Sequence, residues 1–306
     1  HKPFLDKESE HHHHHDHTTV ITSLNKSFLI GIGLNIAFVI AEFSIGIYYN
    51  SLGLISDAGH NLSDVASLIL AMLAFRLAQI APNGKYTYGY KKSTVLVSLL
   101  NAIILLIAVG VILGESLGKL FNPQPVEGVP IAWTAGVGVF INGITAWLFM
   151  KDKDKDLNVK GAYMHMAADA LVSVGVVFSG ILISYTGWSI IDPLIGIVIA
   201  CIIIYSTWSL LHDSIRLSLD GVPVGTDGEK IREQIMEVAD VVECHHLHIW
   251  AISTTETALT AHIVIENFSV LEVVKKEVKT ILLNSGIRHV TLEFEDVENS
   301  CSEHKC

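Results

Sequence analysis

Charge is scarce in this chain, and positive charge is the scarcer kind. Only 17% of its 306 residues are charged, and 20 Lys and Arg against 31 Asp and Glu give a formal net charge of −11. Nucleic acid is therefore disfavoured as a partner, because phosphate binding needs clustered Lys and Arg. Half of the residues are hydrophobic and the mean hydropathy is +0.47, values that soluble globular proteins rarely reach. The composition predicts a membrane protein whose acidic, His-rich character suits cations.

Cysteine is also rare. The chain has four cysteines with no regular framework of spacings, at positions 201, 244, 301 and 306. The sequence therefore requires no disulfide bonds, and reduced thiols or occasional metal ligands are the simpler interpretations.

The start of the chain is rich in His, which occupies positions 11–15 and 17. No cleavable signal peptide is visible, and the chain begins at His1 without a Met. A purification tag is one interpretation, but tags usually carry six uninterrupted His, so a native tail is favoured. A native tail could bind a metal ion through neutral imidazoles. The alternative is a disordered tail with no role in metal binding.

Long apolar stretches dominate the first two thirds of the chain. A helix needs about 20 mainly apolar residues to cross the hydrocarbon core of a membrane. Six stretches meet this condition, at 27–48, 54–78, 94–117, 129–150, 162–184 and 190–211. The sequence thus predicts an all-α bundle of six transmembrane helices.

The basic residues indicate how this bundle is oriented. Four Lys or Arg lie at the end of the second stretch or in the loop that follows it, and four more lie between the fourth and fifth stretches, at positions 76, 85, 91, 92, 151, 153, 155 and 160. The loops on the opposite side are nearly free of Lys and Arg, with only Lys119 in 116–128. Because Lys and Arg concentrate in cytoplasmic loops, both termini are predicted to lie in the cytosol.

After the sixth stretch, charged residues return and the apolar positions become periodic. Capping residues and alternation predict helix, strand, strand, helix, strand, at 226–239, 245–252, 257–265, 270–284 and 288–295. This αββαβ order predicts a small α+β open-faced sandwich, which commonly serves dimerisation or sensing. The expected domains are a His-rich tail at 1–25, a six-span transmembrane domain at 26–213, this cytosolic domain at 214–298 and a Cys-containing tail at 299–306.

Two similar polar motifs interrupt the apolar stretches. The second stretch holds His60 and Asp64, and the fifth holds His165 and Asp169. Residues four apart on a helix project from the same face, so each pair presents one imidazole and one carboxylate together. Two facing helices would then offer a four-ligand tetrahedral set suited to Zn²⁺.

The membrane makes this set hard to explain as structural. An Asp near the bilayer centre costs at least about 2.5–3.5 kcal/mol on insertion scales, so such residues usually face an interior site or a water path. A single pair could be an intrahelical His–Asp hydrogen bond that stabilises the bundle. Its repetition on a second helix favours a metal site.

The same ligands suggest a driving mechanism. Metal binding needs neutral His and ionised Asp, so protons and metal compete for one site. Protonation from outside would release Zn²⁺ there, deprotonation towards the cytosol would let it bind, and rocking of the bundle would alternate access. The hypothesis is proton-coupled export of a divalent metal.

Two other functions use the same residues. An intramembrane metalloenzyme would hold a catalytic metal, but a hydrolytic zinc centre keeps an open position and a general base. Four protein ligands and the lack of a spare acidic partner in these helices disfavour it, so the chain is not expected to be an enzyme. A membrane metal sensor would signal through its cytosolic domain. Neither alternative predicts metal flux.

At this point the chain resembles the cation diffusion facilitator family, which includes eukaryotic zinc transporters and bacterial zinc/proton antiporters. Five segments between about Lys26 and Asp296 carry the resemblance: Leu54-Ile-Ser-Asp-Ala-Gly-His-Asn-Leu-Ser-Asp64, Tyr88-Gly-Tyr90, His165-Met-Ala-Ala-Asp169, Asp192-Pro193 and His245-His-Leu-His-Ile-Trp250. The first and third segments are highly specific.

The resemblance implies a homodimer in a lipid membrane, six spans with cytosolic termini, and proton-coupled efflux from the cytosol. The transport site would consist of His60, Asp64, His165 and Asp169. In this family, His at the position of His60 accompanies preference for Zn²⁺, and Asp there accompanies tolerance of Cd²⁺. The membrane would be a bacterial plasma membrane or a eukaryotic organelle membrane.

The resemblance also implies a metallochaperone-like cytosolic domain with a zinc site of its own. His245, His262 and Glu295 resemble its ligands, and Glu293 lies on the same strand face as Glu295. The alternative is that these are surface side chains on a solvated sheet. Lys92 and Asp220 resemble a charge interlock between the two domains, or else form an exposed ion pair worth only about 0–1 kcal/mol.

The last cysteines, Cys301 and Cys306, resemble a zinc-binding pair of some eukaryotic members. Their spacing is Cys-x₄-Cys and not Cys-x₂-Cys, so a frayed reduced tail is the stronger interpretation.

Overall fold

The computed structural model describes residues 17–48, 52–121, 129–188 and 190–298. Both the His cluster at 11–15 and the pair Cys301 and Cys306 lie outside the described residues, so the expectations for them stay predictions.

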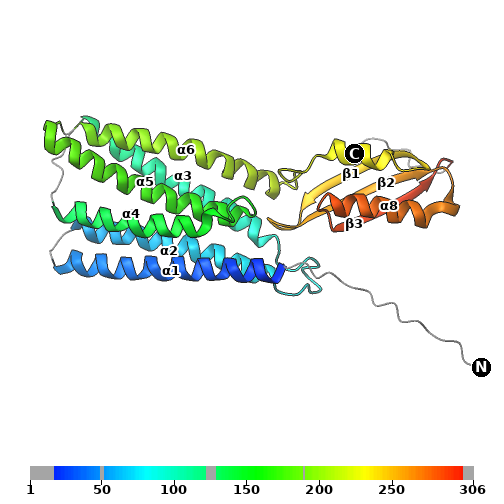
Figure 1. The fold of residues 1–306 in the computed structure, drawn as a ribbon, viewed down its shortest axis with the longest axis horizontal. Coiled ribbons are helices and arrows are strands. Elements are labelled where there is room, and N and C mark those ends of the chain that lie inside the picture. Colours follow the sequence, from blue (N-terminus) through cyan, green and yellow to red (C-terminus); the bar gives the residue numbers. More distant parts are fainter. Residues whose placement is uncertain (1–16, 49–51, 122–128, 189, 299–306) are drawn as a thin grey trace, which may run out of the picture.

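Within the described residues, six long helices form a bundle at one end of the molecule (Figure 1). Their bounds are α1 His17–Tyr48, α2 Leu52–Ala78, α3 Ser93–Phe121, α4 Val129–Met150, α5 Leu157–Thr186 and α6 Ile191–Ser218. Helix α6 continues beyond residue 213, where the end of the transport domain was expected. The start of α1 and the last turn of α6 lie at the same end of the bundle, next to the smaller domain.

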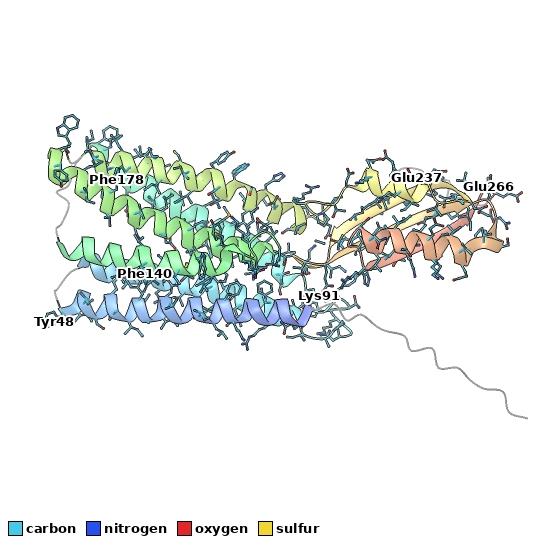
Figure 2. All side chains as sticks on the ribbon, in the orientation of Figure 1. Tyr48, Lys91, Phe140, Phe178, Glu237 and Glu266 are labelled. Carbon is cyan, nitrogen blue, oxygen red and sulfur yellow. The ribbon has the colours of Figure 1, made fainter. Side chains whose placement is uncertain are left out.

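The outer surface of the bundle is apolar. Figure 2 shows Phe140 and Phe178 on it, and these side chains are 68% and 54% exposed. Exposed aromatic residues also gather at the end remote from the smaller domain, at Tyr48, Tyr185 and Trp188. An apolar face of this extent indicates a protein surface in contact with membrane lipid. Tyr and Trp concentrate at the interface between membrane and water. Charged side chains such as Lys91, Glu237 and Glu266 are found at the junction and on the smaller domain (Figure 2).

Three described stretches are long and apolar enough to cross a membrane: Lys26–Ile45, Ser93–Phe121 and Pro193–Ser218. A shorter apolar helix covers Gly136–Met150. The chain is therefore a helical membrane protein with more than one span.

The interior of the bundle brings α2 and α5 together. Helix α5 contacts α2, α3, α4 and α6, whereas α1 packs on α2 and α4. The fully buried rings of Phe28 on α1 and Phe149 on α4 lie 4.7 Å apart and belong to the same core cluster as Leu68 on α2 and Met166 on α5. This core fixes the faces that α2 and α5 turn inward, and the polar motifs lie on those faces.

The smaller domain has the predicted αββαβ order. Its elements are α7 Gly228–Met236, β1 Val241–Ala251, β2 Thr257–Ile265, α8 Leu271–Asn284 and β3 His289–Asp296, with a 3₁₀ turn at Phe268–Val270. The sheet order is β1-β2-β3, antiparallel between β1 and β2 and parallel between β2 and β3. Asp227 caps α7 by accepting hydrogen bonds from the backbone N–H groups of Glu229 and Lys230.

One face of this sheet is covered by both helices. The buried core contains Ile235 of α7, Ile249 of β1, Ile263 of β2 and Val278 of α8. Side chains alternate along a strand, so the residues between these core positions point to the opposite face. His262 and Glu295 lie on that open face, each next to a neighbour that packs in the core, Ile263 and Phe294.

Lys92, immediately before α3, joins the two domains. Its Nζ donates to Asp220 Oδ1 at 2.5 Å and also to the carbonyl oxygens of Leu217 and Ala251 at 3.0 and 3.1 Å. The neighbouring Lys91 pairs with Glu256 at 2.6 Å. Lys92 is therefore held by three acceptors, which an exposed ion pair alone would not provide.

A second junction contact involves the turn between β1 and β2. The backbone N–H of Thr254 donates to Thr94 Oγ1 at 3.0 Å, and the Thr254 hydroxyl donates to Asp156 Oδ2. The other oxygen of Asp156 accepts from the backbone N–H groups of Asn158 and Val159, at the start of α5. The smaller domain thus contacts the first turn of the helix that carries His165.

Asp156 predicts a pH-dependent stability. Burial raises its pKa above the ordinary 3.8, although hydrogen bonds from Thr254, Asn158 and Val159 oppose that rise. The folded protein thus keeps a proton that the unfolded chain has released. This stabilising contribution is full below pH 3.8 and is lost as the pH rises through the folded-state pKa. Asp156→Asn cannot ionise and so does not lose this stability as the pH rises. Its melting temperature should therefore rise relative to that of the wild type, by about 2–4 °C for each kcal/mol that the wild type loses.

The measurement is thermal unfolding in detergent across a pH series, with the exposed Asp154→Asn as control. A constant difference between Asp156→Asn and the wild type at all pH values would contradict the prediction.

Candidate metal centres

Three of the four predicted transport ligands meet inside the bundle. Asp64 lies on α2, and His165 and Asp169 lie one turn apart on α5. Their ligand atoms all lie within 4.8 Å of one another. His165 Nε2 is 2.6 Å from Asp64 Oδ1 and 3.7 Å from Asp169 Oδ2. A bond of 2.6 Å is short for this type of pair and indicates a charge-assisted hydrogen bond.

The group is secluded from solvent. Asp64 is 1% exposed and His165 is 6% exposed. The second oxygen of Asp64, Oδ2, makes no hydrogen bond to any described residue. A buried carboxylate oxygen without a partner loses the solvation it has in water, so it favours a cation in that position.

The fourth predicted ligand, His60, lies on α2 one turn before Asp64. Its side chain lies outside the described part of the structure. The helical spacing puts its backbone on the face that carries Asp64. Its role as a ligand stays a prediction.

The donor set suits a divalent metal. One imidazole nitrogen and two carboxylates supply two negative charges, which would balance a dication in a buried site. Zn²⁺ accepts N and O ligands in tetrahedral geometry, and three protein ligands leave one position for a fourth.

Sequence reasoning missed two polar groups near this cluster. Asn101 on α3 and Ser67 on α2 line a small cavity of about 10 Å³ beside His165, and Asn101 Oδ1 has no hydrogen-bond partner among the described residues. Glu42 on α1 is buried as well and accepts a hydrogen bond from Asn61 on α2. Sequence reasoning did not single out Glu42 either. The signal was a lone Glu within an apolar stretch.

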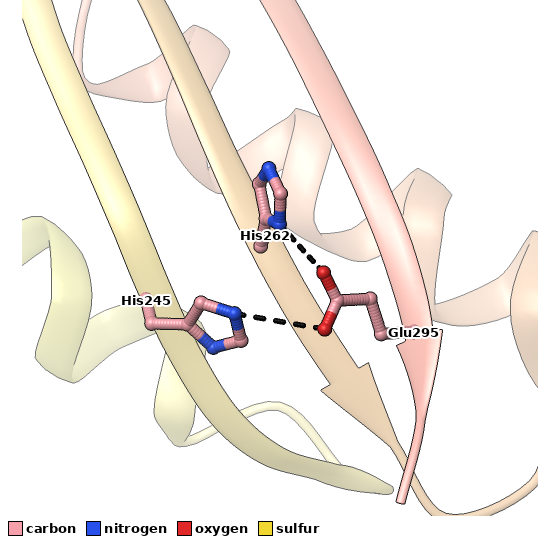
Figure 3. A group of neighbouring side chains, drawn as sticks. All are labelled: His245, His262 and Glu295. Atoms are coloured by element: carbon pink, nitrogen blue, oxygen red, sulfur yellow. Dashed lines mark hydrogen bonds and ion pairs between the residues drawn. The ribbon is translucent and has the colours of Figure 1, made fainter. Parts of the chain in front are cut away.

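A second cluster lies on the open face of the sheet. His245 on β1, His262 on β2 and Glu295 on β3 present ligand atoms within 4.8 Å of one another. Figure 3 shows both imidazoles turned towards the carboxylate, with His262 Nδ1 2.6 Å from Oε1 and His245 Nε2 3.6 Å from Oε2. Three adjacent strands each supply one residue. The donor set of two imidazoles and one carboxylate fits Zn²⁺.

Two further residues border this cluster. Glu293 Oε2 lies 3.4 Å from His262 Nε2, as its strand position suggested. His246 is closer than its sequence position indicates, since its ring centroid lies 5.1 Å from that of His245 and 5.0 Å from that of His262. The pairing of β1 with β2 shifts between His245 and His248, and His246 adopts a φ of 49°. This bulge breaks the alternation, so the proximity of His246 could not be derived from a regular strand.

Family models match both domains. The model described as the cation efflux transmembrane domain matches residues 28–217, and the model described as the cation efflux protein cytoplasmic domain matches residues 223–297. The first of these covers more than half of the chain.

Individual relatives match over nearly their whole length. The zinc transporter ZitB of Pectobacterium atrosepticum is 32% identical, over 92% of this chain and 88% of the relative. The cadmium, cobalt and zinc/H(+)-K(+) antiporter of Bacillus subtilis is 34% identical, over 88% of each. The metal cation efflux system protein CzcD of Cupriavidus metallidurans is 35% identical, over 88% of this chain and 86% of the relative. These are names of transporters and not of enzymes, and the chain belongs to the cation efflux family, the cation diffusion facilitators.

Proposed function

We propose that this protein exports divalent metal, mainly Zn²⁺, from the cytosol in exchange for protons, by alternating access in a homodimer. In this proposal α1–α6 all span the membrane and both termini are cytosolic. The transport domain covers 26–213 and the metallochaperone-like domain covers 214–298. Relatives named for zinc, and one also for cadmium, cobalt and H(+), support the choice of cargo and counter-ion. The name ZT_dimer of the second matching model supports the homodimer.

The observation that carries the proposal is the buried bond between Asp64 and His165. It joins α2 to α5 and uses two atoms that would both bind the metal, His165 Nε2 and Asp64 Oδ1. A proton held between them occupies the position that the cation needs. Metal can therefore enter only as this proton leaves, which makes exchange a property of the site.

Alternating access follows from the positions of the ligands. Because Asp64 and the pair His165 and Asp169 belong to different helices, a small displacement of α2 against α5 separates them. Separation lowers metal affinity, and protons arriving from the other side then satisfy the carboxylates. The protein needs to supply only binding, desolvation and relative movement of helices.

The experiment is metal flux into proteoliposomes, with wild type and Asp169→Ala compared across Zn²⁺, Cd²⁺, Co²⁺ and Mn²⁺ and across imposed pH gradients. Zn²⁺ flux that rises with the gradient and is lost in Asp169→Ala is the expected result. Flux that is indifferent to the gradient would contradict the exchange, and no flux of any metal would contradict transport itself.

We also propose that His245, His262 and Glu295 hold Zn²⁺ as a structural or regulatory ion in the cytosolic domain. His245 and Glu295 are buried although both are polar, and a shared cation would offset the cost of that burial. Zinc bound there would tie β1, β2 and β3 together on the face that no helix covers.

The proposal predicts that His262→Ala lowers the zinc content of the protein by one ion per chain and weakens zinc-dependent thermal stabilisation, while flux through the bundle persists. Metal analysis after dialysis, with melting curves at several zinc concentrations, measures both effects. The exposed His289→Ala is the matched control on β3. Unchanged zinc content in His262→Ala would contradict the site.

A further inference from the structure

Glu42 is an acidic residue inside an apolar helix. It lies on α1 within the stretch Lys26–Ile45, which is long and apolar enough to span a membrane, and it is 1% exposed. An ionisable side chain at such a position is costly and is retained where it has a partner and a function. The predicted metal ligands are on α2 and α5, so they leave Glu42 unexplained.

One partner of Glu42 is on α2. Asn61 Nδ2 donates to Glu42 Oε2 at 2.7 Å, and Asn61 is 5% exposed. This bond joins two helices that pack against each other along their length. A hydrogen bond to a carboxylate in a buried setting is stronger than one between neutral groups, so it fixes the contact between the helices.

The bond has a defined relation to the metal cluster. Asn61 precedes Asp64 by three residues, which is about 4.5 Å along the helix and about 60° around it. Both side chains are buried, and Asp64 reaches across to His165 on α5. Helix α2 therefore carries, on one side of its axis, a contact to α1 and a contact to the metal cluster.

A rotation of α2 would break the cluster. Turning a helix by about 20° moves an atom about 5–6 Å from its axis by roughly 2 Å. A shift of that size would take Asp64 Oδ1 out of hydrogen-bond and ligand distance of His165 Nε2. Some interaction must therefore set the rotation of α2, and the bond to Glu42 lies within one helical turn of the residue that needs it.

We propose that Glu42 and Asn61 are a positioning pair, which holds α2 at the rotation that presents Asp64 to the metal. The proposal rests on the function proposed above, because it assigns these residues to the same transport site. They act through Asp64 and are not themselves ligands. The alternative that Glu42 carries a transported proton is an outcome of the test.

The test compares Glu42→Ala, Asn61→Ala and Glu42→Gln with wild type. Zn²⁺ affinity is measured calorimetrically in detergent, and KM and maximal flux are measured in proteoliposomes at several pH values. We expect Glu42→Ala and Asn61→Ala to lower the affinity and raise KM by about 10-fold or more, as loss of groups that orient metal ligands does. Glu42→Gln should stay within about twofold of wild type, because its amide oxygen accepts the same bond.

The matched control is Ser98→Ala. It removes another buried bond between helices, the 3.0 Å contact of Ser98 with Ser214, which joins α3 to α6 and involves neither α1 nor α2. Wild-type KM in this variant with a changed KM in Asn61→Ala supports the proposal and separates positioning from general bundle stability. Melting curves identify any variant that fails to fold. If Glu42→Ala does not fold, the comparison of Glu42→Gln with Asn61→Ala is enough to test the proposal.

Two outcomes overturn the positioning proposal, and a third concerns transport alone. Wild-type affinity in Glu42→Ala or Asn61→Ala would show that the bond does not position Asp64. Equal loss in Glu42→Gln and Glu42→Ala, with an altered pH dependence of flux, would assign the function to the charge of Glu42 and not to its hydrogen bond. If wild type binds Zn²⁺ but shows no flux, the transport proposal fails, and the calorimetric affinities still decide the positioning role.

Discussion

Asp64→Asn is expected to reduce Zn²⁺ flux by about 100-fold or more while the protein remains folded. The substitution keeps the size of the side chain and leaves an amide oxygen that can accept a bond from His165, so the contact between α2 and α5 persists. It removes one of the two negative charges that would offset the dication in this buried site. Replacing a residue that only orients a metal ligand lowers metal affinity or activity by about 10–100-fold. Replacing a ligand itself should lower it by at least the upper end of that range.

The measurement is initial flux in proteoliposomes together with calorimetric Zn²⁺ affinity. Asp152→Asn is the control, because Asp152 pairs with Lys155 in the turn before α5 and contacts no ligand. Retained flux in Asp64→Asn, with melting behaviour like that of wild type, would remove Asp64 from the transport site.

His60→Asp is expected to admit Cd²⁺, raising the ratio of Cd²⁺ to Zn²⁺ flux by about 10-fold or more. Replacing a nitrogen ligand by a carboxylate changes ligand number and geometry more than overall affinity, and metal selectivity depends on those features. A third carboxylate can bind through one or both oxygens, which gives a larger ion more contacts. This expectation rests on the family resemblance and on the position of His60 one helical turn from Asp64.

A competition assay with both metals present measures this change in selectivity. His212→Asp, an exposed His to Asp substitution on α6, controls for the added negative charge. The prediction fails if His60→Asp transports Zn²⁺ with the selectivity of wild type.

The metal cluster could be predicted in part because its information is local. His165 and Asp169 share a helix face by spacing alone, and their polarity within an apolar stretch indicates an interior position. The contact between Asp64 and His165 needed one further assumption, that α2 faces α5. The match of two His-x₃-Asp motifs made that assumption reasonable. The order of elements in the cytosolic domain was predictable for the same reason, since capping and alternation are local patterns.

The remaining features depend on how rigid elements meet. Nothing in the sequence near Glu42 indicates Asn61 as its partner, because the rotation of α1 against α2 is set by packing along their whole length. The same holds for His246, which a bulge turns towards the cytosolic cluster.

The sequence by itself determined the class of the protein, the approximate positions of its helices and the residue types of the proposed ligands, since these follow from composition and from interactions a few residues apart. The tertiary structure decided which residues support those ligands. It places Glu42 in a hydrogen bond with Asn61, one helical turn from Asp64. It also places Thr254 of the cytosolic domain in a hydrogen bond with Asp156, just before the helix that carries His165. Such contacts depend on the relative rotation and depth of elements far apart in the chain, which only close packing of the whole molecule fixes.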